Sequence, residues 1–266
     1  MPRLRNNRRA ARALLCGALC LALSACGASS SPAAPPTPEP AASRPALGVM
    51  TSLPLYWPLG ADIAAIAAGS APVPWQRGVL EQAFRLTPLD TLSPMPGLAP
   101  DAPEIDPLVG LDRLAVIQPR GLSPSDNVAL DDWVRAGGRL LLVLDPQLTG
   151  EYDLPLGDPR RPAQSALIPP VAARWGLAIA FDEAQAPEPK AQSIGTATVP
   201  LVLAGQIAVT DPGAAQCTLL AAGAAARCKV GAGQVTVIAD AAIFEHAELA
   251  GEGGAALAAL MKAVLG

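Results

Sequence analysis

Short hydrophobic runs alternate with amphipathic segments through the second half of the chain. Continuous apolar runs at 114–117 and 140–144 are typical of strands that are buried on both faces. Between them, Ser123 and Pro124 form a helix start, and the helical pattern ends at the glycine pair 137–138. A strand, a capped helix and a second strand predict a βαβ unit with parallel strands.

The remaining periodicity predicts further elements around this unit. Strands are expected at 47–52, 84–89, 177–181 and 235–239, and helices at 60–68, 75–83, 165–175 and 253–265. Residues 199–209 and the segment from Cys217 to Cys228 predict antiparallel strands. We therefore expect an α/β fold in which an open, mostly parallel sheet is flanked by helices and followed by a β-rich C-terminal extension.

The N-terminus combines a basic start with a short apolar stretch. All five charged residues of the segment 1–25 are arginines, and residues 13–23 are apolar but too short to span a bilayer as a helix. The run Leu-Ser-Ala-Cys that ends at Cys26 resembles the lipobox of bacterial lipoproteins. This resemblance implies cleavage before Cys26, acylation of the thiol and the amine of that cysteine, as by palmitate, and a mature protein tethered to a membrane by lipid. The alternative is an ordinary signal peptide with an accidental cysteine.

The residues after this cysteine predict a tether. Residues 26–46 are rich in Ala, Ser and Pro, which prevents regular structure and extends the chain. Gly27 stands where an Asp would resemble an inner-membrane retention signal, and this slightly favours the outer membrane. The expected organisation is a signal peptide at 1–25, a lipidated cysteine and tether at 26–46, and one α/β domain facing the periplasm at 47–266.

Charge narrows the range of partners. Loss of the five signal arginines leaves 14 basic residues against 23 acidic ones, a net charge of −9 for the mature chain. An acidic surface of this kind repels nucleic acid and anionic lipid headgroups, so no nucleic-acid partner is expected.

The two cysteines that remain in the domain predict a disulfide. Cys217 and Cys228 are eleven positions apart, and an oxidising periplasm favours their pairing. Free or metal-binding thiols are the alternative, but the chain has a single histidine, His246, so no metal site and no cofactor are expected.

The βαβ unit also carries a family resemblance. It rests on Leu-Asp-Arg-Leu-Ala-Val-Ile-Gln-Pro at 111–119, Leu-Ser-Pro at 122–124, and Asp-Trp-Val-Arg-Ala-Gly-Gly-Arg-Leu-Leu-Leu-Val-Leu-Asp-Pro at 132–146. These stretches resemble the periplasmic auxiliary domain of gliding-motility-type ABC transporters, which is similar in fold to class I glutamine amidotransferases. The resemblance implies a flavodoxin/amidotransferase-like fold and ABC transporter subunits as partners.

The same resemblance argues against amidotransferase catalysis. Amidotransferases carry a nucleophilic Cys on the turn after the strand equivalent to 140–144. Here that turn is Asp145-Pro146-Gln147, which offers no thiol, and its proline removes a backbone N–H that an oxyanion hole would use.

Polar residues at the carboxyl ends of the predicted strands form a candidate cleft, because ligands of open α/β sheets bind there. The candidate residues are Ser52, Tyr56 with its neighbour Trp57, Gln118, Arg120, Asp145 and Asp240. Asp145 and Asp240 are candidates for an acid/base pair or for binding a cation or a polyol, and the alternative is that each caps a helix or loop. His246, which follows Glu245, is expected to be a solvated residue at a helix start.

Together these patterns predict a non-catalytic, lipid-anchored periplasmic domain that binds or scaffolds parts of an ABC-type transport or envelope-assembly system. Two alternatives remain open at this point. One is a periplasmic hydrolase that uses the pair Asp145 and Asp240, and the other is a lipoprotein that binds a small solute.

Overall fold

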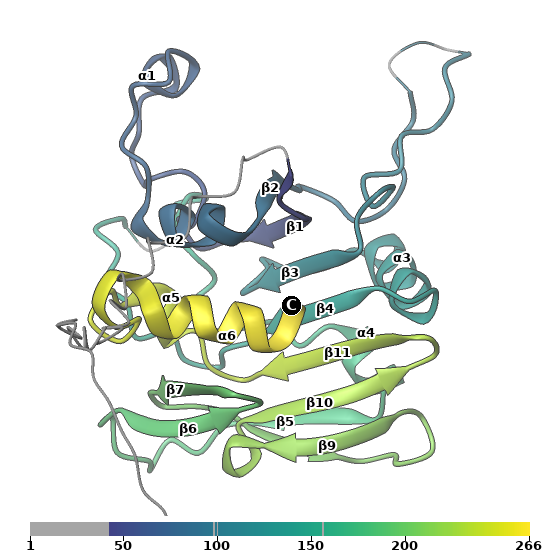
Figure 1. The fold of residues 1–266 in the computed structure, drawn as a ribbon, viewed down its shortest axis with the longest axis vertical. Helices are drawn as coiled ribbons and strands as arrows, with labels where there is room; N and C mark the ends of the chain where they lie inside the picture. The colour runs from purple at the N-terminus through teal and green to yellow at the C-terminus, as the bar shows by residue number, and fades with distance from the viewer. Residues whose placement is uncertain (1–42, 98, 100, 156) are drawn as a thin grey trace, which may run out of the picture. The chain divides into compact units, whose positions relative to one another are not determined.

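A seven-stranded sheet forms the centre of the computed structural model, which describes residues 43–97, 99, 101–155 and 157–266 (Figure 1). The strand order is β2-β1-β3-β4-β11-β10-β9. These strands are β1 (Ala46–Thr51), β2 (Arg85–Pro88), β3 (Arg113–Ile117), β4 (Arg139–Val143), β9 (Gln216–Leu220), β10 (Ala225–Val230) and β11 (Gly233–Ile238). The first five in this order pair in parallel, and β10 and β9 continue the sheet antiparallel. The fold is therefore α/β with a mostly parallel sheet and a β-rich C-terminal region.

Helices and two small two-stranded sheets surround the central sheet. The helices are α1 (Ile63–Ala67), α2 (Trp75–Ala83), α3 (Pro124–Arg135), α4 (Pro170–Arg174), α5 (Ala242–Glu245) and α6 (Ala255–Leu265), with short 3₁₀ turns at Ala221–Gly223 and Glu252–Gly254. The small sheets pair β5 (Leu177–Ala180) with β8 (Gln206–Val209), and β6 (Lys190–Ile194) with β7 (Ala197–Leu201), both antiparallel.

The predicted βαβ unit is present as β3, α3 and β4. The Ser123 hydroxyl accepts a hydrogen bond from the Asp126 N–H at 3.0 Å, and the Asp126 carboxylate accepts one from the Ser123 N–H at 3.1 Å. This reciprocal capping box fixes the start of α3. Burial opposes ionisation of Asp126, but hydrogen bonds from Ser123, Thr91 and two backbone N–H groups outweigh it and hold the pKa well below its usual range.

Two hydrophobic cores cover the two faces of the sheet. On one face, α2, α6 and β7 pack on alternate strand residues such as Ala115 and Leu141. On the other face, α3, α4, β5 and β8 pack on the residues between them, such as Leu114 and Leu140. The sheet is thus the middle of three layers, which explains why its central strands are continuous apolar runs.

Some elements differ from the sequence prediction because of proline and polarity. The helix expected at 165–175 is confined to Pro170–Arg174, since each residue before Pro169 and Pro170 is forced out of the helical region. Strand β6 was not predicted, because its sequence is polar and only Ile194 is buried. The helix expected at 60–68 is limited to α1.

The predicted disulfide is confirmed. Cys217 and Cys228 lie directly opposite each other on β9 and β10, with a Cα–Cα distance of 4.0 Å. Their bond links the outer strand of the sheet to its antiparallel neighbour.

The described residues belong to one compact unit, Pro38–Gly266. The predicted signal peptide, the lipidated Cys26 and the tether up to residue 42 lie outside the described residues. Within the part that is described, no helix combines the length and apolarity needed to cross a bilayer.

Candidate functional site

The carboxyl ends of four neighbouring parallel strands bring most of the predicted cleft residues to one edge of the sheet. Ser52 follows β1, Gln118 follows β3, Asp145 follows β4 and Asp240 follows β11. The Ser52 hydroxyl donates to the carbonyl of Gln118 at 2.5 Å, so the ends of β1 and β3 are joined directly.

Gln118 holds the ends of β3 and β4 together. Its side-chain Nε2 donates to the carbonyls of Asp145 at 2.9 Å and Ala163 at 2.8 Å, and its Oε1 accepts from the Asp145 N–H at 2.8 Å. Its backbone has a positive φ of 45°, which a residue other than glycine adopts only where surrounding contacts impose it. The glutamine is completely buried and its polar atoms are satisfied by the protein's own backbone.

Asp145 and Asp240 also bind the backbone. The Asp145 carboxylate accepts from the N–H groups of Gln147 and Ala241, both at 2.8 Å. The Asp240 carboxylate accepts from the N–H groups of Val202 at 2.5 Å and Ala242 at 2.8 Å. These bonds tie the loop after β4, the end of β7 and the start of α5 to the strand ends.

Burial dominates the electrostatics of this carboxyl pair. Asp145 is 0% exposed and Asp240 is 1% exposed. Burial raises the pKa of Asp145 to about 7, and burial together with the nearby Asp145 raises the pKa of Asp240 to about 8. Raised pKa values are common in active sites, but here solvent does not reach either side chain.

A second polar cluster lies next to this pair. The sequence analysis did not predict it. The Tyr152 hydroxyl donates to Glu245 at 2.6 Å, and the Thr149 N–H donates to the same carboxylate at 3.0 Å. The Thr149 hydroxyl lies 2.9 Å from Nε2 of His246. Burial, followed by the hydrogen bond to Glu245, raises the pKa of Tyr152 above its usual range. The adjacent residues Glu245 and His246 were the only part of this cluster that stood out in the sequence. No sequence pattern linked them to the loop after β4.

His246 follows α5 rather than starting a helix. Its side chain is 26% exposed, and its Nδ1 lies 3.5 Å from Glu248. The Thr149 hydroxyl also lies 3.4 Å from the Glu245 carboxylate.

The other candidate residues lie apart from the buried pair. Ser52, Tyr56 and Trp57 line a pocket of about 290 Å³, together with Asp90 and Arg160. The Arg77 guanidinium lies 4.2 Å from the centre of the Tyr56 ring and holds it by a cation–π contact.

Arg120 is exposed and donates to the carbonyl of Arg161 at 2.8 Å. The structure therefore divides the predicted cleft into a small pocket, a buried backbone-binding group and one surface arginine.

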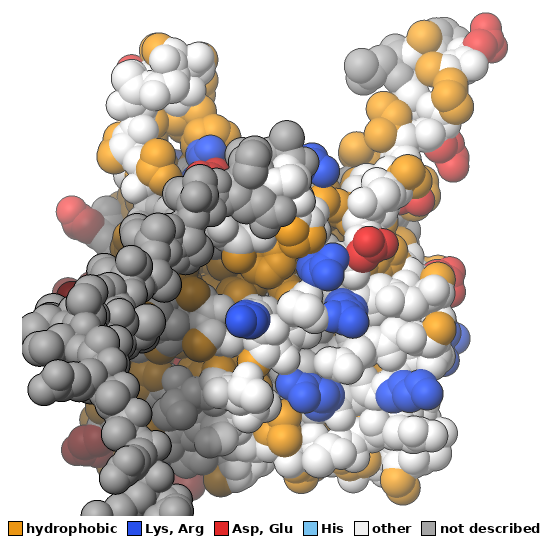
Figure 2. Space-filling view, viewed as in Figure 1, with side chains coloured by type: hydrophobic (Ala, Val, Ile, Leu, Met, Phe, Trp, Pro, Cys, Tyr) orange, Lys and Arg blue, Asp and Glu red, His pale blue; other side chains and the backbone are white. Residues whose placement is uncertain are grey.

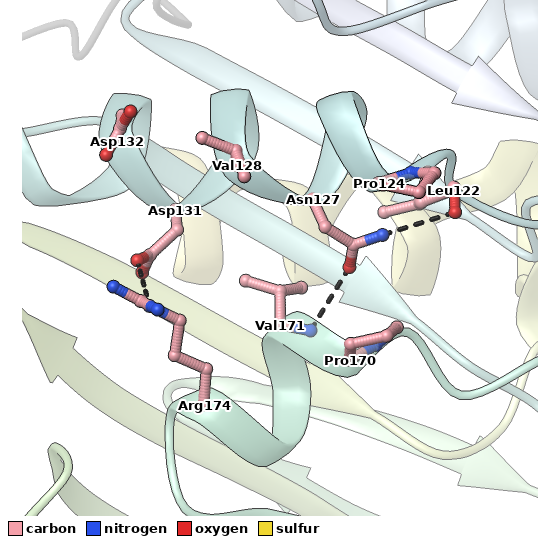
Figure 3. A pocket seen from close by; sticks show the side chains of 9 residues that line it. All are labelled: Leu122, Pro124, Asn127, Val128, Asp131, Asp132, Pro170, Val171 and Arg174. Carbon is pink, nitrogen blue, oxygen red and sulfur yellow. Dashed lines mark hydrogen bonds and ion pairs between the residues drawn. The ribbon is translucent and has the colours of Figure 1, made fainter.

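A further groove lies between α3 and α4 (Figure 3). It has a volume of about 440 Å³ and an apolar lining that includes Leu122, Val128 and Val171. At one end Arg174 forms an ion pair of 2.6 Å with Asp131, which also accepts from the indole N–H of the buried Trp175 at 2.8 Å. No sequence pattern indicates this groove, because its two walls come from helices about 40 residues apart.

No group of three or more His, Cys, Asp or Glu side chains within the described ranges is arranged to hold a metal ion. Asp145, Asp240 and Glu245 are near one another, but the first two direct both of their oxygens to backbone N–H groups.

Comparison with known proteins places the sequence in a family and finds similar solved structures. A family model described as a domain of unknown function, DUF4350, matches residues 80–261, which is more than half of the chain. No curated protein matches the sequence.

The similar solved structures are parts of larger enzymes. Exo-β-1,4-mannosidase Op5Man5 from Opitutaceae bacterium strain TAV5 is 15% identical with a TM-score of 0.47, over 84% of this chain and 36% of that chain. The cold-adapted β-galactosidase from Rahnella sp. R3 is 16% identical with a TM-score of 0.43, over 83% of this chain and 31% of that chain. The chain thus spans about a third of the length of these enzymes.

Proposed function

The chain belongs to the DUF4350 family of domains of unknown function, and we propose that it acts as a non-catalytic, lipid-anchored periplasmic domain. In this proposal it binds or scaffolds components of an ABC-type transport or envelope-assembly system. Cys26 carries the lipid, the outer membrane is the favoured location, and the partners include ABC transporter subunits. The support for this address and for the transporter link is the N-terminal pattern and the resemblance over 111–146.

The observation that carries the non-catalytic part is the state of the carboxyl edge of the sheet. In an open α/β fold this edge is where ligands bind. Here Gln118, Asp145 and Asp240 are buried and their side chains bind backbone groups. An acid/base pair must reach the proton that it transfers, and a carboxylate without solvent-exposed surface has no such access.

The exposed apolar residues support a binding role. Two segments, one around α1 and one between β2 and β3, project from the body of the domain, and orange side chains are visible on both projections (Figures 1 and 2). Their exposed apolar residues are Trp57, Ile63, Val73, Met95, Ile105 and Val109. Ile63 is 82% exposed and Val109 is 75% exposed, so apolar side chains on both projections are accessible to a partner.

The finer fold assignment is part of the same proposal. We infer an amidotransferase-like arrangement in which β3, α3 and β4 correspond to the resembling stretches. Without a thiol in the turn after β4, such a domain keeps the scaffold but lacks the nucleophile.

Metabolic labelling tests the lipid anchor. Cells that express the full chain are given an alkyne-bearing palmitate, and the protein is examined for label and for its membrane fraction. Label on the natural chain and loss of label in Cys26→Ser support the anchor. Equal labelling of both chains, or none in either, contradicts it.

Photo-crosslinking tests the partner. A crosslinking amino acid is placed at Ile63 or Ile105 on the projecting segments, and at the exposed Val128 of α3 as a matched control. The proposal expects transporter subunits in the adducts from the first two positions and not from the third. Adducts that lack any transporter subunit would count against the proposed partner.

The hydrolase alternative is tested by removing both acids. Asp145→Asn combined with Asp240→Asn preserves the shape of the side chains. An intact cellular phenotype in a folded double variant supports the non-catalytic role, whereas loss of function with native stability would overturn it.

A further inference from the structure

Arginines occupy the first positions of three parallel strands. β2 begins at Arg85, β3 at Arg113 and β4 at Arg139. Since the amino ends of parallel strands lie at one edge of a sheet, the three cations share the edge opposite to Asp145 and Asp240.

The strand register extends this row of cations across the sheet. Arg139 is paired with Gln234 on β11, Gln234 with Lys229 on β10, and Lys229 with Gln216 on β9. Residues paired in register point to the same face, and so does Arg227, which lies two positions before Lys229. We use the name amino-edge cations for Arg113, Arg139, Arg227 and Lys229, together with the exposed Lys262 of α6.

This part of the sheet is not covered by a helix. A hollow of about 460 Å³ lies over it, and the described residues that line it include Arg139, Arg227 and Lys229 but no Asp or Glu. Figure 2 shows Lys and Arg side chains gathered on this face, while most Asp and Glu side chains of the view lie around its rim. The net charge of the mature chain is therefore an average over faces of different sign.

Some of the amino-edge cations stabilise the fold by hydrogen bonds to α6, but these bonds use only part of their donors. Three arginines donate to carbonyls at the end of α6: Arg113 to Leu265 at 2.6 Å, Arg227 to Ala263 at 3.4 Å, and Arg139 to Gly266. Each of these contacts uses one of five guanidinium donors. Among the described residues, Lys229 and Lys262 form no ion pair with an acidic side chain, so the charge of neither ammonium group is compensated within the domain.

The tether enters the domain at this same edge. β1 begins at Ala46, which is paired with Arg85, the first residue of β2. The 20 residues from Cys26 to Ala46 reach at most about 70 Å, which leaves every face of the domain able to meet the membrane. A tether of this reach does not fix which face of the domain is turned toward the membrane. An uneven distribution of surface charge can fix it.

We propose that the amino-edge cations form a membrane-docking surface that binds anionic phospholipid headgroups. The inference rests on the proposed lipid anchoring, since the anchor keeps the domain within reach of the headgroups and the cations then determine which face meets them. It orients the domain so that the amino edge of the sheet faces the lipid and the opposite edge faces the periplasm.

Vesicle sedimentation tests the surface without the anchor. The mature chain, residues 26–266 with Cys26→Ser, is mixed with vesicles of 30% phosphatidylglycerol in phosphatidylcholine, or with phosphatidylcholine alone. We expect partition to the anionic vesicles only, and its loss at high salt. Because the acyl chain is removed in advance, a negative result here is separate from a failure of the palmitate labelling.

A charge-matched pair of variants makes the test specific. Arg139→Gln with Lys229→Gln should weaken partition roughly 30-fold, since each cation near an anionic surface contributes about fivefold. Arg160→Gln with Lys190→Gln removes the same charge from other exposed positions and should have an effect of less than about threefold.

Three outcomes would overturn the proposal. They are equal binding to neutral and anionic vesicles, undiminished binding by the amino-edge variant, and an equal loss in the control variant, which would show that net charge alone matters. Inorganic phosphate at 10 mM should leave vesicle binding intact, and full competition would assign the surface to free phosphate instead.

Discussion

The two edges of the parallel sheet hold their charged side chains in opposite ways. At the carboxyl edge, Asp145 and Asp240 are buried, and each carboxylate accepts hydrogen bonds from two backbone N–H groups. At the amino edge, Arg139 and Lys229 are exposed and line an open hollow. At the edge where α/β proteins usually bind ligands, the polar side chains bond to the backbone, whereas at the opposite edge two cations remain accessible to solvent.

The largest expected effect comes from removing a carboxylate at the carboxyl edge. Asp145→Ala leaves the buried N–H of Ala241 and the partly buried N–H of Gln147 without acceptors, and we expect a loss of about 4 kcal/mol in the free energy of unfolding. Chemical denaturation measures this loss. Asp153→Ala, an exposed acid on the following loop, should change the free energy of unfolding by less than about 0.5 kcal/mol. Similar values for the two variants would remove the contrast between buried and exposed charge.

The pH dependence of stability sharpens the same contrast. The raised pKa values of Asp145 and Asp240 mean that the folded state binds more protons than the unfolded state between about pH 4 and pH 8. The unfolding free energy should therefore fall as pH rises through this window. Denaturation at pH 5 and pH 9 measures the fall. A natural chain that is more stable at pH 9, or one whose profile is unchanged by Asp240→Asn, would contradict the assignment.

A covalent bond stabilises the amino half of the sheet. Cys217 and Cys228 pair in the register row of Val235, near the start of β11. Replacing both by Ser should lower the unfolding free energy by about 2 to 3 kcal/mol, because the closed loop restricts the unfolded chain. Thermal unfolding with and without reductant checks this result. Reductant should lower the melting temperature of the natural chain and leave that of the Ser variant unchanged.

The smallest expected effect on stability is at the amino-edge cations themselves. Arg139→Gln combined with Lys229→Gln should change the unfolding free energy by less than about 1 kcal/mol, because both side chains are exposed. The same variant is expected to lose vesicle binding. A large loss of stability in it would mean that these cations, like Asp145 and Asp240, serve the fold.

Much of the architecture could be predicted from local sequence. The runs 114–117 and 140–144 and the capping residues Ser123 and Pro124 were enough to predict β3, α3 and β4, because burial on both faces and a helix cap leave direct patterns. The pairing of Cys217 with Cys228 followed from their number and spacing. Strand β6 escaped prediction since a polar edge element leaves no such pattern.

The candidate site was predicted less completely. Sequence order correctly indicated that Gln118, Asp145 and Asp240 end neighbouring strands. It did not indicate that their side chains turn inward to bind backbone groups, nor that Tyr152 and Thr149 meet Glu245. Those contacts join residues about 90 positions apart, and only packing of the loops decides them.

The sequence by itself therefore determined the elements, the disulfide pair and the sign of the overall charge, since each depends on local pattern or composition. The tertiary structure decided which charges are buried and which are exposed. Strand order and register place Arg113, Arg139 and Lys229 in one row and close the opposite edge over Asp145 and Asp240. Net charge averages over the surface, whereas binding depends on the field near one face, and that field exists only once the strands are paired.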